Sequence, residues 1–464
     1  MTPASVLVST DVVWSLSDEM TFPFEEISPW IREPDDPGAS LQGEQRADVV
    51  IIGAGYTGLS AALSLREQGV DVLVLERDFA GAGASGCNAG HLTPTIGKDL
   101  PTLLRMFGEE RAQALVQFAD QAVEYTEHIV KHLGIECSYE PNGNVLAAVH
   151  PKHEKRLLEA AAMASRLGAD VRFLSGEEMR ERGLPRAFHC GVLEQRGGVL
   201  DPGQYVTGLR QAAIDAGVRL HEHSPVQSID KSTPVRVRCD SGVVSADSAV
   251  VATNAYSRSI GFMPRKVVPL RVSLFETEPL SASQLAAIDW NGREGIYTSH
   301  EVLESYRLSA RNTIIGGSRV VRYAYGSKLA QGYDPGAFET IESAFRQRFP
   351  QLEGVLVQRF WGGWIGLGLD FLPMIGTTGD QENIHYGFGY AGHGVAQATL
   401  MGAMLSDRIL GSAHECESAL ARRPWPWPPE PLRYAAYEAV TRVLYAIDAR
   451  TDRQLRTLRV DRVH

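Results

Sequence analysis

The fold class that the sequence predicts is α/β, and three observations predict it. Residues 47–78 follow the order of a buried β-branched strand, a glycine turn, a helix and a second strand. Residues 382–410 repeat the strand, the turn and the helix more than three hundred residues later. Residues 266–317 alternate apolar with polar side chains, which predicts a sheet with one solvated face. A Rossmann-type domain and a second domain built around a sheet would produce these patterns.

Length and composition are those of a globular protein with about two domains, interleaved or consecutive. The chain has 464 residues, of which 44% are hydrophobic and 22% are charged. Its net charge is −11 and its basic residues are scattered, so nucleic acid is not expected as a partner. No uninterrupted apolar run reaches the ~18 residues of a transmembrane segment, and the N-terminus lacks the basic region of a secretory signal. We therefore expect a cytoplasmic protein without a transmembrane segment.

Cysteine and histidine usage gives no sign of a disulfide framework or a metal centre. The five cysteines, an odd number, are far apart and include no C-x-x-C pair. The 13 histidines form no cluster at ligand spacing. We expect free thiols and no bound metal.

The first glycine motif, "GAGYTG" at residues 53–58, has the form G-x-G-x-x-G. Gly53 permits a tight turn, Gly55 lets the backbone approach a pyrophosphate, and Gly58 allows the helix to pack closely on the strand. The N-terminus of the following helix offers N–H donors to the phosphates. Glu76 follows the second strand, where a carboxylate can accept hydrogen bonds from ribose hydroxyls and would repel a 2′-phosphate. The motif predicts a dinucleotide site but does not distinguish NAD from FAD.

A loop of small residues follows the acid and carries a resemblance to a known family. Residues 83–90, "GASGCNAG", resemble the "GASGRNGG"-like segment of the D-amino-acid oxidase-like family of FAD-dependent oxidoreductases. Cys87 and Ala89 depart from that pattern, in which arginine and glycine are commoner. In the family this segment runs along the cofactor toward the flavin, so the resemblance implies that the dinucleotide is FAD.

The second glycine motif, "GFGYAGHG" at residues 387–394, lacks half of a nucleotide site. No strand that ends in an acid follows its helix, because the chain enters a proline-rich tail after residue 410. Residues 389–394, "GYAGHG", resemble the family's segment that caps the flavin ring, and a helix beginning near Gly394 would present its positive end there. One FAD then accounts for both motifs, with its ADP half at the first and its isoalloxazine ring at the second.

The resemblance extends over residues 28–432 and is closest in look to γ-glutamylputrescine oxidoreductase-like and glycine oxidase-like members. "SPWIREP" at residues 28–34 resembles the short aromatic lead-in ahead of the first strand in relatives of γ-glutamylputrescine oxidoreductase. The resemblance implies an α/β fold, in which a Rossmann-type FAD-binding domain is interleaved with an α+β substrate domain carrying an antiparallel sheet. The expected segments are an N-terminal extension (1–46), three parts of the FAD-binding domain (47–102, 196–262 and 359–412), two parts of the substrate domain (103–195 and 263–358) and a C-terminal tail with a helix (413–464).

The residues expected to bind FAD come from the two motifs, the loop between them and the segments that the resemblance brings back to the cofactor. They are Gly53, Gly55, Tyr56, Thr57, Gly58, Glu76, Arg77, Gly83, Ala84, Ser85, Asn88, Ala89, Gly90, His91, Val226, Thr253, Gly363, Gly392, His393, Gly394 and Val395.

Amine oxidation by a flavin needs little acid–base machinery, because the flavin itself accepts the hydride. His91 and His393 are the candidate catalytic residues, and a local hydrogen-bonding role is the alternative for each. Trp361 and Trp364 are candidates for the wall of a substrate pocket or for the core. Arg307, like Arg319, could anchor a substrate carboxylate or lie on the surface.

The function implied is that of an FAD-dependent amine or amino-acid oxidase or dehydrogenase, which oxidises a C–N bond to an imine and passes electrons to oxygen or another acceptor. Some family members attach FAD to a cysteine in the region of residues 365–372, and this chain has none there, so we expect non-covalent FAD. An NAD(P)H-fed flavin monooxygenase and a non-catalytic flavoprotein subunit are the alternatives. The helix of the tail is expected on the surface or at the contact of a homo-oligomer.

Overall fold

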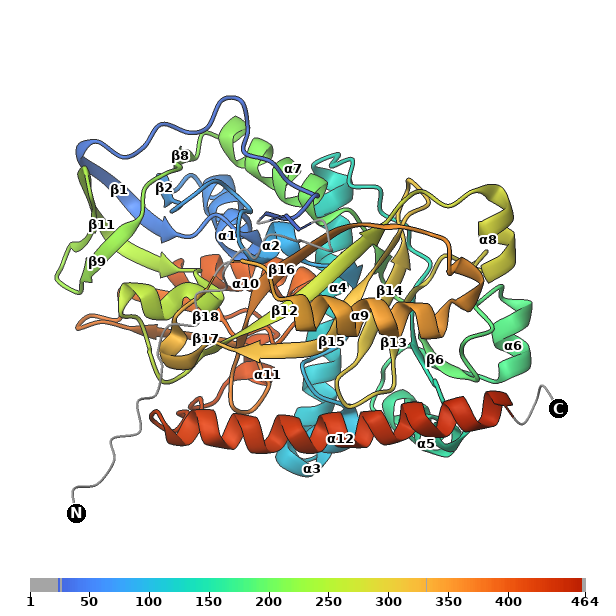
Figure 1. The fold of residues 1–464 in the computed structure, drawn as a ribbon. Coiled ribbons are helices and arrows are strands. Elements are labelled where there is room, and N and C mark those ends of the chain that lie inside the picture. Colours follow the sequence, from blue (N-terminus) through green and yellow to red (C-terminus); the bar gives the residue numbers. More distant parts are fainter. Residues whose placement is uncertain (1–23, 26, 331, 461–464) are drawn as a thin grey trace, which may run out of the picture.

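The computed structural model describes residues 24–25, 27–330 and 332–460, so most of the expected N-terminal extension lies outside the described part of the chain. Two large sheets organise these residues, and Figure 1 shows helices packed around both. Each sheet has eight strands, drawn from segments that alternate along the chain. The segments that build the two sheets are therefore interleaved along the chain.

The first sheet, here called the mixed sheet, has a parallel centre in the order β18-β11-β1-β2-β8. β17 pairs antiparallel with β18 at one edge, and β9 and β10 form an antiparallel extension on β11. Its strands are β1 (Gly43–Ile52), β2 (Val72–Leu75), β8 (Arg219–His221), β9 (Val226–Asp230), β10 (Val235–Cys239), β11 (Gly242–Val251), β17 (Met374–Thr378) and β18 (Ile384–Phe388).

The second sheet, here called the antiparallel sheet, has the order β16-β12-β15-β14-β13-β4-β6-β5, and only its β13–β4 pair is parallel. β16 crosses the domain boundary expected at residue 358 but pairs with β12 along its length. The strands are β4 (Asn144–Ala147), β5 (Val171–Leu174), β6 (Gly191–Glu194), β12 (Val268–Thr277), β13 (Gly295–Thr298), β14 (Glu304–Leu308), β15 (Ile314–Tyr323) and β16 (Val357–Leu367).

The helices α1, α4, α7 and α10 form one apolar core around the mixed sheet. α1 begins directly after the first glycine turn, and α10 begins directly after the second. The helices are α1 (Tyr56–Glu67), α2 (Ala84–Cys87), α3 (Leu100–Phe107), α4 (Glu109–His132), α5 (Glu154–Arg166), α6 (Gly176–Glu181), α7 (Pro202–Asp215), α8 (Ala282–Ile288), α9 (Pro335–Arg348), α10 (Gly394–Ile409), α11 (Glu417–Leu420) and α12 (Leu432–Val460).

The expectation of one solvated face is wrong for the central strands of the antiparallel sheet. Nine of the ten residues of β12 are buried, and all of β14 is buried. On one face Phe275 packs against Phe345 of α9, with ring centroids 5.1 Å apart. On the other face Leu270, Val272 and Leu274 line an internal cavity. The alternation in sequence therefore separates a helix-packed face from a cavity face.

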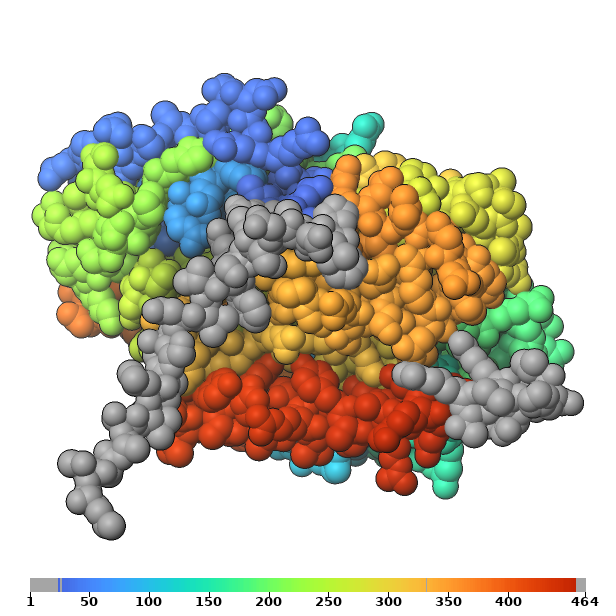
Figure 2. Space-filling model, viewed as in Figure 1, coloured from blue at the N-terminus to red at the C-terminus, as the bar shows by residue number. Residues whose placement is uncertain are grey.

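The C-terminal helix α12 lies along the lower edge of the molecule in Figure 1 and is exposed along that edge in Figure 2. It is the longest described helix, with 29 residues, and polar and charged residues recur along it. Among the described residues, no helix is both long enough and apolar enough to cross a membrane.

Candidate active site

A cavity of about 770 Å³ extends from the first glycine turn, past the second, to α12. Residues at the carboxyl ends of β1, β2 and β11 line one end of it, which is where open α/β sheets bind their ligands. Strands β12 and β16 of the antiparallel sheet line the other end. The cavity thus joins a nucleotide-type site to a second, more apolar chamber.

The first glycine turn is shaped to leave backbone N–H groups open toward the cavity. Gly53 has φ +103°, a conformation that favours glycine. Gly55 is the N-cap of α1, and no side chain caps the helix there. A Cβ at Gly58 would lie 1.9 Å from the carbonyl oxygen of Gly53, so the turn closes only with glycine at that position. The uncapped helix end is suited to a pyrophosphate.

Glu76 is held beside this turn by two backbone donors. Its Oε2 accepts from the N–H of Ala54 at 2.8 Å, and its Oε1 accepts from the N–H of Asp78 at 3.1 Å. Burial raises the pKa of Glu76 above its ordinary value, against the effect of these hydrogen bonds. Each oxygen keeps a lone pair, so the carboxylate can accept hydrogen bonds from a ribose diol.

The small-residue loop 83–90 folds onto the first turn through short side chains. The Ser85 hydroxyl accepts from the N–H of Tyr56 at 3.1 Å. Asn88 donates to the carbonyl of Ser85 at 2.8 Å and accepts from the N–H of Gly90 at 2.8 Å. The loop is therefore preorganised along the cavity without a bulky side chain crossing it.

The second glycine motif is tied directly to the first. The Thr57 hydroxyl and the Tyr390 hydroxyl are 2.6 Å apart. Gly392 has φ +92°, and α10 begins at Gly394 without a side-chain cap. The uncapped N-terminal ends of α1 and α10 therefore both lie at one cavity, which supports a single ligand spanning both motifs.

Both candidate histidines line this cavity and are uncharged at neutral pH. Burial lowers the pKa of His91 to about 4, and burial lowers the pKa of His393 to about 4. Nδ1 of His393 is 2.8 Å from the Thr95 hydroxyl. Nδ1 of His91 is 3.0 Å from Oδ1 of Asn144, whose amide nitrogen already donates to the carbonyl of Leu92.

These contacts fix the tautomer of His91. Because Asn144 presents its oxygen, Nδ1 of His91 carries the proton and Nε2 carries a lone pair. That Nε2 is buried and has no hydrogen-bond partner among the described residues. His91 can therefore accept a proton or a hydrogen bond beside the cavity, at the energetic cost of charging a buried ring.

The chamber beyond the second motif is walled by apolar and aromatic side chains. Trp364 of β16 lines it and is 8% exposed. Among the described residues that line the whole cavity, Arg77 is the only arginine or lysine. Arg77 sits at the Glu76 end, where its guanidinium lies 5.0 Å from the ring centroid of Tyr256. The chamber itself therefore offers no cationic anchor.

The structure gathers most of the expected cofactor residues around the cavity. Gly58 lies outside the lining and closes the turn from behind. The expected residues that line the cavity are Gly53, Gly55, Tyr56, Thr57, Glu76, Arg77, Gly83, Ala84, Ser85, Asn88, Ala89, Gly90, His91, Val226, Thr253, Gly363, Gly392, His393, Gly394 and Val395.

Two of the three expected substrate-binding residues do not line the cavity. Arg307 is 3% exposed, donates to the carbonyl of Ala89 and lies 4.9 Å from the ring centroid of Trp30, so it supports the small-residue loop from behind. Trp361 is fully buried and donates to the carbonyl of Cys87 at 3.1 Å. Strand alternation explains the difference, because Trp361 and Trp364 are three residues apart on β16 and point to opposite faces.

Several residues that build the site escaped the sequence reasoning. Asn144, which orients His91, lies at the start of a strand with no motif around it. Five residues of α12 line the cavity although they belong to the tail, where the sequence shows only apolar residues at helical spacing. That spacing predicts that one face of the helix is buried, but it does not show which part of the protein that face packs against.

Residues 48–408 match the family described as DAO, FAD dependent oxidoreductase. The chain belongs to this family of FAD-dependent oxidoreductases, and the uncapped glycine turns, the Glu76 carboxylate and the small-residue loop fit FAD.

Individual relatives agree with this assignment. The chain is 30% identical over 396 residues to γ-glutamylputrescine oxidoreductase of Escherichia coli, which covers 84% of this chain and 90% of that protein. It is 28% identical over 382 residues to a probable oxidoreductase of Haemophilus influenzae, covering 79% of this chain and 84% of that one. Glycine oxidase from Geobacillus kaustophilus has the same fold, with a TM-score of 0.70, 18% identity, and coverage of 82% of this chain and all of that one.

Proposed function

We propose that this protein oxidises the C–N bond of an amine or amino acid to an imine, which water then hydrolyses. The observation that carries the proposal is the single cavity, which places an apolar chamber against both glycine motifs. The similarity to γ-glutamylputrescine oxidoreductase supports an amine as substrate. FAD, when bound, supplies the acceptor for the hydride.

The residues of the chain have to position the substrate and keep its nitrogen uncharged. An ammonium has no lone pair to support departure of the hydride, so the neutral amine is the reactive form. Apolar walls such as Trp364 disfavour the cation by removing it from water, which lowers the pKa of a bound amine. His91 and His393 are uncharged and add no positive charge of their own. The site therefore selects the reactive protonation state by desolvation.

Anaerobic mixing of the purified flavoprotein with a panel of amines and amino acids tests the proposal. Loss of the flavin absorbance with one class of amine is the expected result. Bleaching by NADPH alone would instead indicate a monooxygenase, and bleaching by neither would indicate a flavoprotein without this activity.

The proposal includes several finer features. FAD is held non-covalently, since residues 365–372 contain no cysteine. Oxygen or another carrier accepts the electrons, and oxygen consumption during turnover distinguishes the two. A cytoplasmic location is expected, and cell fractionation tests it. A homo-oligomer with α12 at its contact is also compatible with the exposure of that helix, and light scattering measures the mass in solution.

A further inference from the structure

The helix α12 contributes one of its faces to the cavity. Ala436, Tyr437, Val440, Thr441 and Leu444 line it, and their spacing of three and four residues places them on one side of the helix. The family match ends at residue 408, before α12 begins. We propose that α12 is the outer wall of the substrate chamber and determines which amine substituents the chamber accepts, an inference that rests on the proposed function.

The exposure of these residues divides the wall into a rim and an interior. Val440 lines the cavity and yet is 57% exposed, so the chamber opens to solvent beside it. Thr441 is 8% exposed, and Leu444 is half-buried. Ala446, about 200° around the helix from Leu444, is exposed and does not line the cavity. A substituent that reaches from the flavin end to α12 would meet Leu444 and Thr441 before it reached solvent.

Tyrosine hydroxyls fasten the helix to the antiparallel sheet beside this wall. The Tyr437 hydroxyl donates to the carbonyl of Val321 on β15 at 2.8 Å. The Tyr445 hydroxyl accepts from the N–H of the same residue at 3.1 Å. Val321 itself lines the cavity, so the helix is bonded to the strand that forms the adjoining part of the chamber.

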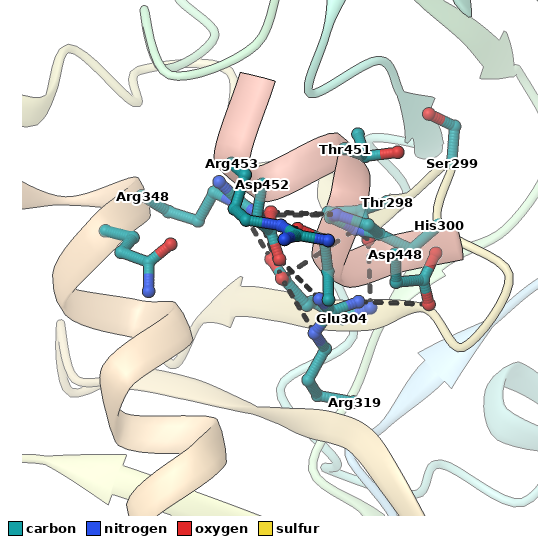
Figure 3. Close-up of polar contacts among 12 residues, drawn as sticks. Thr298, Ser299, His300, Glu304, Arg319, Arg348, Asp448, Thr451, Asp452 and Arg453 are labelled. Atoms are coloured by element: carbon teal, nitrogen blue, oxygen red, sulfur yellow. Dashed lines mark hydrogen bonds and ion pairs between the residues drawn. The ribbon is translucent and has the colours of Figure 1, made fainter. Parts of the chain in front are cut away.

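The C-terminal half of α12 also positions a loop of the chamber. Figure 3 shows Asp448 and Asp452 of this helix beside Arg319. The carboxylate of Asp448 accepts from the N–H groups of Glu301 and Val302, each at 2.9 Å. Glu301, Val302 and Leu303 all line the cavity. One buried aspartate on the helix therefore fixes the backbone of a cavity-lining segment.

A buried charge cluster next to this loop anchors the helix. Asp452 pairs with Arg348 at 2.9 Å and with Arg319, and Arg348 also pairs with Glu304 at 2.8 Å. Burial opposes ionisation of Asp452, but its hydrogen bond to His300 and the two guanidinium charges hold its pKa below the ordinary value. Arg319 and Arg348 pair with both of these carboxylates, so the cluster serves as an ionic anchor for the helix.

The chemistry of the wall indicates the class of substituent. None of its five residues carries a charge, and Val302, Leu303 and Val321 line the cavity beside them. Such a surface gains free energy by taking aliphatic groups out of water and has no partner for a carboxylate. We therefore expect an amine with an uncharged aliphatic substituent to be preferred over one that ends in a carboxylate.

A chain-length series of primary amines, from propylamine to octylamine, tests the wall in the holoenzyme. The second-order rate constant of anaerobic flavin reduction should rise by about fourfold for each buried methylene until the chain reaches α12. Leu444→Trp should lower the octylamine to propylamine ratio by at least tenfold, and Leu444→Ala should raise it. Ala446→Trp places the same bulk on the outer face of the helix and should leave the ratio unchanged. Equal ratios in all four proteins would overturn the assignment.

A second measurement distinguishes an error in the assignment of α12 from an error in the proposed function. Aliphatic primary carboxamides are uncharged and have no basic nitrogen lone pair to support departure of a hydride. They are not oxidised by the same route, so their binding is followed by the change in flavin absorbance. If no amine reduced the flavin, the proposed function would fail, while the chain-length dependence of binding would still report on Leu444. If neither Leu444→Trp nor Leu444→Ala changed the chain-length selectivity of probe binding, the assignment of α12 as the wall would be wrong, even in an active amine oxidase.

Discussion

Replacing Gly55 with alanine is the smallest change that tests the FAD site. An alanine Cβ at this position would lie 2.8 Å from Oγ of Ser85, closer than side chains normally approach. The Ser85 hydroxyl would have to rotate away, and the N–H of Tyr56 would lose the acceptor that now lies at 3.1 Å. The methyl group would also stand at the uncapped start of α1, where a pyrophosphate must approach the backbone.

The loss can be expressed as an affinity. One neutral hydrogen bond contributes about 1 kcal/mol, and one hydrogen bond to a charged group about 1.5–3 kcal/mol. Losing one backbone contact to the phosphate would therefore weaken FAD binding by roughly tenfold to a hundredfold, since about 1.4 kcal/mol corresponds to a factor of ten. Titration of the apoprotein with FAD, followed by calorimetry or by flavin fluorescence, measures this directly.

Gly354→Ala is the matched control, because a Cβ at Gly354 would have no atom within 4 Å. That variant should bind FAD as the unaltered protein does. Unchanged FAD affinity in Gly55→Ala, with the control behaving normally, would show that the pyrophosphate does not lie against this turn.

Four further predictions concern flavin attachment, the pH dependence of flavin reduction, the pH dependence of stability and the anchor of α12. Acid precipitation should release all flavin into the supernatant, whereas flavin retained on a peptide would reveal a covalent link that residues 365–372 do not provide through cysteine. The flavin reduction rate should rise with pH and reach its plateau at a pH below the free amine's pKa of about 10.4. The variants His91→Asn and His393→Asn should keep that rise, because both histidines are already neutral above about pH 4. A rate independent of pH in either variant would identify that histidine as the base. Between about pH 6.5 and about pH 4, these two imidazole rings bind fewer protons in the folded protein than in the unfolded protein. The melting temperature should therefore fall as the pH falls through that window, and the fall should be smaller in either variant. Asp452→Asn removes a charged partner of Arg319 and Arg348, although Asp448 and Glu304 remain paired with them. The loss of charge-assisted hydrogen bonds should destabilise the fold by about 1.5–3 kcal/mol in chemical denaturation, and an unchanged midpoint would show that the cluster does not anchor the helix.

The nucleotide half of the site was predictable because local geometry determines it. A turn that requires glycine at Gly53 and Gly58, followed by an acid after the next strand, leaves a pattern that can be read without the rest of the chain. The helix α1 runs over Tyr56–Glu67 and β2 over Val72–Leu75, in the order expected for residues 47–78. The link between the two motifs followed only from the family resemblance, since a contact such as that of Thr57 with Tyr390 joins residues 333 positions apart.

The substrate half was much less predictable, because it depends on which face of each strand and helix meets the cavity. The alternation of apolar and polar residues along β12 was visible in the sequence. It could not show that α9 covers one face of the strand and that the chamber, not bulk solvent, adjoins the other. Arg307 looked like a carboxylate anchor and proves to be a support for the small-residue loop. The role of α12 depends on a buried cluster in which Asp452 pairs with arginines more than a hundred residues away.

Single-turnover reduction of the bound flavin by an amine tests the central claim most directly. Rapid anaerobic mixing with the most reactive amine of the panel, and with the same amine carrying deuterium on the carbon beside nitrogen, separates hydride transfer from binding. The account predicts complete bleaching of the flavin, with a slower rate for the deuterated amine and the imine or its aldehyde or ketone as product. Flavin that stayed oxidised with every amine, and was bleached by NADPH, would contradict it.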